Sequence, residues 1–198
     1  MTETVALVHG ISNWPWRDPA LWGCAPVLRA RGYSVELVGY GFSGPVSARA
    51  RMRAVIGRLA EIAPDHVIGH SHGGAIAMEY GEDHTVDALV LVQPAVRRDA
   101  GVPRKAGRVL CLHNKGDWAV RIGGVSRLAN PVNVLHRHPW GDAGRVGLDE
   151  ADGVTNWDTE GDVAFPVSGH AGPLIGGSEQ AYWTHRIADY LKEGVCTG

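Results

Sequence analysis

The sequence predicts an α/β protein, a three-layer α/β/α sandwich with a mostly parallel sheet of about six strands. Two observations predict this class. Short apolar runs rich in β-branched residues recur along the chain, and segments with helical spacing separate most of them. Parallel strands need such crossovers and are buried on both faces, which makes them read as continuous apolar runs. With no repeats or linkers in 198 residues, we expect a single domain spanning 1–198.

The first half of the chain supplies three predicted strands. They are TVALVHG (4–10), YSVELVGYG (33–41) and DHVIGHS (65–71). A helical segment interrupted by glycine and proline, residues 17–32, joins the first two. Residues 45–64 form the clearest helix, because one face collects Ala48, Met52, Val55, Ile56 and Leu59.

The second half continues the alternation. Residues 73–84 are predicted to be a helix, and strands are expected at 87–95, at 108–117 and, as the last strand, at 132–138. A C-terminal helix ends at Gly194. Residues 139–167 are rich in glycine and aspartate with little periodicity, so we expect a long irregular loop there. Such a loop is the main segment able to cover a site.

Composition excludes several classes of function. A formal net charge of −2 gives no electrostatic reason to expect nucleic acid or an anionic membrane as partner. No apolar run approaches the roughly 20 residues that span a bilayer, and no basic leader precedes the first strand, so we expect a cytoplasmic protein. The three cysteines, Cys24, Cys111 and Cys196, are widely spread, which favours reduced thiols over disulfides.

Ser71 stands where the third strand gives way to a helix. A serine hydroxyl is a poor nucleophile unless a base removes its proton and its geometry is enforced. A sharp strand-to-helix turn projects such a side chain and aims the following backbone N–H groups and the helix dipole at the reacting centre. That turn needs small neighbours, and Gly69 and Gly73 complete the pattern G-x-S-x-G.

In this context the segment VIGHSHGGAIAMEYG resembles the nucleophile elbow of the α/β-hydrolase superfamily, and the resemblance extends along most of the chain. It implies a catalytic order of serine, acid and histidine. By that match Ser71 is the nucleophile, Asp117 in RVLCLHNKGDWAV is the acid, and His170 in FPVSGHAGPL is the base. The His-Gly pair of VALVHGISNW implies that the amides of Ile11 and His72 form an oxyanion hole, with His9 bracing the loop.

The chain also departs from the superfamily pattern. Asn114 stands where glycine is common, and the 52 residues between Asp117 and His170 exceed the usual spacing. The chain opens on the His-Gly strand, so we expect the fold to lack the two N-terminal strands common in the superfamily. Residues 96–107 leave no room for a helical cap. The resemblance thus implies a small, cap-poor member with an open site.

Two histidines compete with His170 for the role of base. His136 and His138 end the strand expected at 132–138 and lie closer to Asp117 in sequence. Their alternation places them on one face, so a metal site is a formal alternative, but no further ligands cluster near them and we expect no metal.

GYGFSG (39–44) matches the dinucleotide fingerprint G-x-G-x-x-G. The acidic residue at nearly the right spacing, Asp65, begins its strand instead of ending it. The superfamily resemblance explains the segment better, as a glycine-rich loop after an early strand, and we expect no cofactor.

The resemblance implies a serine esterase, carboxylesterase-like, that cleaves small-molecule carboxylic esters through an acyl-enzyme. Trp14 and Trp118 are predicted to contact the substrate, with Trp16 and Trp157 as further candidates for an aromatic pocket. Thioester hydrolysis, hydroxynitrile lyase and perhydrolase chemistry use the same triad. A binding protein that keeps the fold without catalysis is the alternative of a different class, and the sequence leaves the oligomeric state open.

Overall fold

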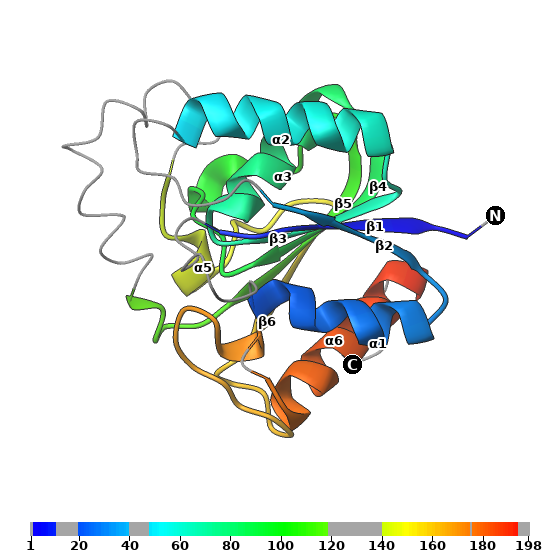
Figure 1. Cartoon of the computed structure of the whole chain (residues 1–198). Coiled ribbons are helices and arrows are strands. Elements are labelled where there is room, and N and C mark those ends of the chain that lie inside the picture. The colour runs from blue at the N-terminus through cyan, green and yellow to red at the C-terminus, as the bar shows by residue number, and fades with distance from the viewer. Residues whose placement is uncertain (1, 11–19, 40–47, 119–139, 175, 194–198) are drawn as a thin grey trace.

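Six strands form one sheet in the order β2-β1-β3-β4-β5-β6 (Figure 1). This is a computed structural model, which describes residues 2–10, 20–39, 48–118, 140–174 and 176–193. All five neighbouring pairs of strands are parallel. The strands are β1 (Thr4–Val8), β2 (Ser34–Val38), β3 (His66–His70), β4 (Val86–Val92), β5 (Ala106–His113) and β6 (Val154–Asp158).

Helices cover both faces of the sheet, which confirms the predicted three-layer sandwich. Figure 1 shows α2 and α3 on one face and α1 and α6 on the other. Their bounds are α1 (Ala25–Ala30), α2 (Ala48–Ile62), α3 (His72–Asp83) and α6 (Ser178–Glu193). Shorter helical elements are η1 (Ala20–Cys24), η2 (Arg98–Ala100), α5 (Ala143–Val146) and η5 (Gly172–Leu174).

Alternation along the strands divides the apolar core between the two faces. In β1, Val5 and Leu7 pack toward α1 and α6, whereas Ala6 and Val8 pack toward α2 and α3. All four side chains are fully buried, and a fully buried Val or Leu contributes roughly 1.5–3 kcal/mol. This two-sided burial explains why the strands appear in the sequence as continuous apolar runs.

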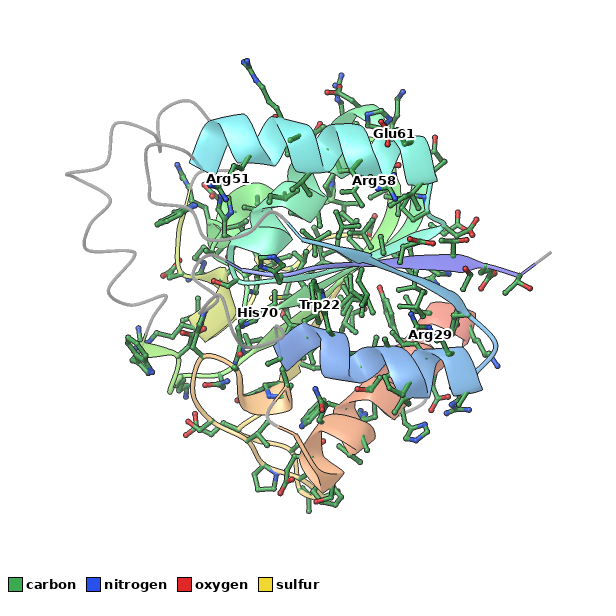
Figure 2. The ribbon with its side chains drawn as sticks, viewed as in Figure 1. Trp22, Arg29, Arg51, Arg58, Glu61 and His70 are labelled. Atoms are coloured by element: carbon green, nitrogen blue, oxygen red, sulfur yellow. The ribbon has the colours of Figure 1, made fainter. Side chains whose placement is uncertain are left out.

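Helix α2 is amphipathic, as its sequence predicted. Met52, Val55 and Leu59 are buried against the sheet side. Arg58 and Glu61 of the same helix, both labelled in Figure 2, are exposed and form an ion pair of 3.2 Å. An exposed pair of this kind contributes only about 0.3–0.5 kcal/mol, so α2 is held mainly by its apolar face.

Residues 139–167 differ from the sequence prediction of an irregular loop. They contain α5 and β6, and β6 pairs with β5 as the last strand of the sheet. The strand was missed because it lies at the sheet edge, where its residues are only half-buried and form no apolar run. The strand predicted at 132–138 lies outside the described residues.

The connection between β4 and β5 matters for access to the site. Residues 93–105, all of which the structure describes, hold the short turn η2 and no longer helix. This agrees with the expectation that no cap is inserted there. Among the described residues no helix is both long enough and apolar enough to cross a bilayer.

Candidate active site

Ser71 occupies a strained turn at the carboxyl end of β3. Its backbone angles are φ 54° and ψ −118°, outside the regions that non-glycine residues ordinarily adopt. Hydrogen bonds hold the turn: Ser71 N donates to the Val92 carbonyl at 3.0 Å, and Ala95 N donates to the Ser71 carbonyl at 3.0 Å. Strain of this kind persists only where the surroundings enforce it, and it concentrates at functional sites.

Close backbone approach explains the glycines around this serine. A Cβ on Gly69 would lie 2.4 Å from the carbonyl oxygen of Gly73, and a Cβ on Gly73 would lie 2.1 Å from that of Val8. Both distances are far below any real contact. A Cβ on Gly10 would lie 2.9 Å from the Cβ of Ser71, so the end of the His-Gly segment lies directly against the serine.

Asp117 and His170 lie together although 53 positions separate them. His170 Nδ1 lies 2.9 Å from Oδ1 and 3.0 Å from Oδ2 of Asp117. The carboxyl is fully buried, whereas the imidazole keeps 22% of its surface exposed. A carboxylate that accepts from Nδ1 fixes the tautomer in which Nε2 is free to take a proton.

His70 brings this pair next to the elbow. Its Nε2 lies 2.8 Å from the carbonyl oxygen of His170, and the two imidazole rings are 4.9 Å apart. Figure 2 labels His70, the residue before Ser71. The backbone of His170 therefore lies beside the turn that carries the serine.

Burial and a neighbouring imidazole set the charge of His70. Burial, and then the charge of His170, lower the pKa of His70 to about 4, so its ring is neutral at pH 7. A carbonyl oxygen can only accept, so Nε2 carries the proton and donates it to His170 O. His70 is thus a neutral hydrogen-bond donor.

His9 stabilises the other side of the site. Its Nδ1 donates to the carbonyl of Gly10 at 2.6 Å. Its ring is T-shaped to that of Trp22, with the ring centroids 6.0 Å apart. Burial lowers its pKa, which favours the neutral imidazole. His9 is therefore fixed at the end of β1 by its contact with Gly10. Its role in bracing the following loop stays a prediction.

The remaining predicted residues have different surroundings. His72, the first residue of α3, has a buried side chain. Its ring is T-shaped to that of Trp140, with the ring centroids 5.7 Å apart. Trp118 is 63% exposed directly after Asp117. Trp157 is partly buried and packs against the core, where it contacts Trp183 and lies under the guanidinium of Arg186 at 4.7 Å.

Several predictions lie outside the described residues: the oxyanion contact of Ile11, the pocket residues Trp14 and Trp16, and the competing bases His136 and His138. Most of GYGFSG lies outside them as well. Asp65, however, accepts from Thr4 N at 2.6 Å at the amino end of β1. This is the edge of the sheet opposite to the one at which open α/β sheets bind ligands.

Metal ligands do not cluster in the part of the chain that the structure describes. No three histidine, cysteine or acidic side chains there could share an ion. The two described cysteines, Cys24 and Cys111, are buried free thiols whose pKa burial raises to about 11 and about 12.

Two polar residues of the site were not singled out from the sequence for any role there. Gln93 and Asn114 directly follow β4 and β5, and both are fully buried. The signal that could have found them is their position, since each is the first amide side chain after an apolar strand.

The sequence profile of the alpha/beta hydrolase family matches residues 5–195. A search of curated proteins finds no match.

Three solved structures illustrate the likeness in fold. A hydrolase of the alpha/beta superfamily from Xanthomonas campestris pv. campestris is 20% identical with a TM-score of 0.54, over 96% of this chain and 98% of that one. The thermophilic carboxylesterase EstE1 from a metagenomic library is 12% identical with a TM-score of 0.51, over 98% and 80%. Carboxyl esterase 2 from the fungus Tuber melanosporum is 12% identical with a TM-score of 0.51, over 96% and 78%.

Proposed function

Since this chain belongs to the alpha/beta hydrolase family, we propose that it is a serine hydrolase that cleaves carboxylic esters with Ser71, His170 and Asp117. The observation that carries the proposal is the hydrogen-bonded pair of His170 and Asp117 beside the strained turn of Ser71. Two similar folds, EstE1 and carboxyl esterase 2, are named as carboxylesterases, which favours an ester as the substrate.

The first half of the reaction acylates the serine. His170 Nε2 takes the proton of Ser71 Oγ as that oxygen attacks the carbonyl carbon of the ester. Asp117 accepts from Nδ1–H and stabilises the imidazolium that forms. His170 then returns the proton to the alkoxide that leaves as the alcohol, and Ser71 is left carrying the acyl group.

The second half regenerates the enzyme. His170 takes a proton from a water molecule as the water oxygen attacks the acyl carbon. The carboxylic acid then leaves, and His170 returns the proton to Ser71 Oγ. In both halves negative charge develops on the former carbonyl oxygen. The backbone amides of Ile11 and His72 hold that charge, aided by the positive end of the α3 dipole. The reaction needs neither metal nor cofactor.

Turnover of a panel of p-nitrophenyl esters tests the proposal. Wild type should hydrolyse esters of this panel, and Ser71→Ala should lose about 10⁴-fold or more in kcat while remaining folded. Ser178→Ala, which alters a serine hydrogen-bonded to Glu179 at the start of α6, should keep full activity. Equal turnover by wild type and Ser71→Ala would exclude Ser71 as the nucleophile.

A further inference from the structure

Three polar side chains from neighbouring strands meet at the backbone of the candidate base. His70 ends β3, Gln93 follows β4, and Asn114 follows β5. Because parallel strands place their carboxyl ends at one edge, these residues line up although the chain separates them by about 20 positions each. All three contact the dipeptide Gly169–His170.

Hydrogen bonds hold both carbonyls of that dipeptide. The carbonyl of Gly169 accepts from Gln93 Nε2 at 2.5 Å and from Asn114 Nδ2 at 3.3 Å. The carbonyl of His170 accepts from His70 Nε2 at 2.8 Å. We call His70, Gln93 and Asn114 the carbonyl clamp.

Asn114 joins the two halves of the candidate acid–base pair. Its side-chain oxygen accepts from Gly169 N at 3.1 Å, and its backbone carbonyl accepts from Asp117 N at 3.2 Å. One residue thus fixes the turn that carries the acid and the loop that carries the base. A one-residue displacement of the base loop would break the contact between Gly169 N and the Asn114 side chain.

The contact of Gln93 with Gly169 occurs together with backbone strain at Gln93. Its φ is +46°, although it is not a glycine, and its side chain is fully buried. Its Oε1 has no hydrogen-bond partner among the described residues, and a buried unsatisfied acceptor costs about 1–3 kcal/mol. A residue chosen for stability alone would avoid both, which points to a function for the Nε2 contact with Gly169.

We propose that the carbonyl clamp positions His170 for proton transfer, so that its three members are positioning residues for the reaction. The catalytic consequence rests on the proposed function. The clamp fixes the backbone on which the imidazole stands, and Asp117 fixes the rotation of the ring. A shift of about 1 Å in the position of a catalytic group can lower a rate about 100-fold.

The structure supplies a matched control. Asn156 in β6 makes the same reciprocal pair with another backbone: Leu148 N donates to its Oδ1 at 2.8 Å, and its Nδ2 donates to the Leu148 carbonyl at 2.9 Å. Asn114→Asp and Asn156→Asp therefore remove the same kind of donor from two sites. Only Asn114 touches the loop of His170.

The experiment compares kcat, KM and the rate of fluorophosphonate labelling in Asn114→Asp, Gln93→Met and Asn156→Asp. We expect the two clamp variants to lose about 10- to 100-fold in kcat and labelling rate, with KM within about 3-fold. Asn156→Asp should lower the melting temperature but keep labelling within about 2-fold. In a His170→Ala background the clamp variants should have no further effect, because the group they position is gone.

If the clamp residues only stabilised the fold, their variants would give different results. If the clamp variants slow labelling equally with and without His170, or no more than Asn156→Asp does, the proposal is wrong. His70 adds a rescue test: His70→Gln keeps a side-chain N–H and should retain far more activity than His70→Leu. Equal losses in both would also overturn the proposal.

A proton resonance separates the failure of this proposal from failure of the proposed function. The proton between His170 Nδ1 and Asp117 gives a low-field NMR signal that requires no reaction. If wild type proves unreactive, the proposed function fails, yet the clamp still predicts that this signal is present in wild type and Asn156→Asp and lost in Gln93→Met. An unchanged signal in folded Gln93→Met would overturn the clamp.

Discussion

The elbow (69–74) and the base loop (168–170) lie at the same edge of the sheet but are held there by different means. Backbone contacts hold the elbow: Gly69 and Gly73 admit carbonyls so close that no side chain fits. The backbone of Ser71 also hydrogen-bonds to Val92 and Ala95. Side-chain hydrogen bonds hold the base loop, through His70, Gln93 and Asn114. The elbow therefore needs small residues beside Ser71 in sequence, although one carbonyl that they admit belongs to Val8 of β1. The base loop depends on side chains 55 or more positions away.

The two regions should therefore tolerate different substitutions. A sterically held turn should fail as a unit when one methyl group is added, with a loss of stability. A loop held by several hydrogen bonds should lose geometry by degrees, with a loss of rate before a loss of fold.

Asp117→Asn should give the largest effect. An asparagine can hold His170 in the wrong tautomer, in which Nε2 carries the proton and cannot act as a base. We expect kcat/KM to fall about 10⁴-fold, equivalent to about 5.5 kcal/mol, with the fold retained. Asp158→Asn, at an exposed carboxylate that caps the turn after β6, is the matched control and should stay near wild type. Similar activities of the two variants would remove Asp117 from the mechanism.

Gly73→Ala tests the steric half of the comparison. Its Cβ would meet the carbonyl of Val8 at 2.1 Å, so β1 and α3 must separate. We expect a loss of about 3 kcal/mol or more in the free energy of unfolding, measured by urea denaturation. Gly57→Ala is the control, since a Cβ in this exposed position of α2 meets nothing within 4 Å. It should stabilise by about 0.5–1 kcal/mol, and equal losses in both variants would contradict the steric account.

Acid should weaken the fold through the neutral histidines of the site. Burial lowers the pKa of His70 to about 4, whereas an unfolded histidine titrates near 6.5. Between these values the unfolded state binds more protons, so stability is complete above pH 6.5 and falls toward pH 4. His70 alone accounts for a loss on the order of 3 kcal/mol.

Urea unfolding at several pH values between 7 and 4 measures this loss. His70→Gln should flatten the pH dependence in that range, while His185→Gln, at an exposed position of α6, should leave it as in wild type. An unaltered slope in His70→Gln would mean that another group is responsible.

Trp118→Ala should give the smallest effect. The side chain is 63% exposed, so we expect the melting temperature to change by no more than about 1 °C. If Trp118 contacts substrate, KM for aromatic esters should rise about 5-fold, equivalent to roughly 1 kcal/mol, and KM for acetate esters should not change. Parallel changes for both kinds of ester would argue against a substrate contact.

Much of the fold could be predicted because its signals are local. Patterns a few residues long predict the apolar strands and the amphipathic helix α2. The exception was β6: as an edge strand with half-buried residues it carries no apolar run, and its pairing with β5 depends on the whole sheet. Local patterns do not record such long-range pairing.

In the candidate site, too, the residues close together in sequence could be predicted, whereas a long-range contact could not. The elbow was recognisable because Gly69, Ser71 and Gly73 must be close in sequence to make one turn. The resemblance selected Asp117 and His170, and the structure places them 2.9 Å apart. Gln93 was not predicted for the site, because its role depends on a carbonyl 76 positions away and on a backbone angle that sequence does not reveal.

The most direct test of the account is the rate at which a fluorophosphonate labels the protein, followed by intact mass. Wild type should gain one adduct, Ser71→Ala should gain none, and His170→Ala should label at least about 10³-fold more slowly. That result would establish Ser71 as a nucleophile that His170 activates. An unlabelled, folded wild type would contradict the account, as would a His170→Ala variant that labels at the wild-type rate.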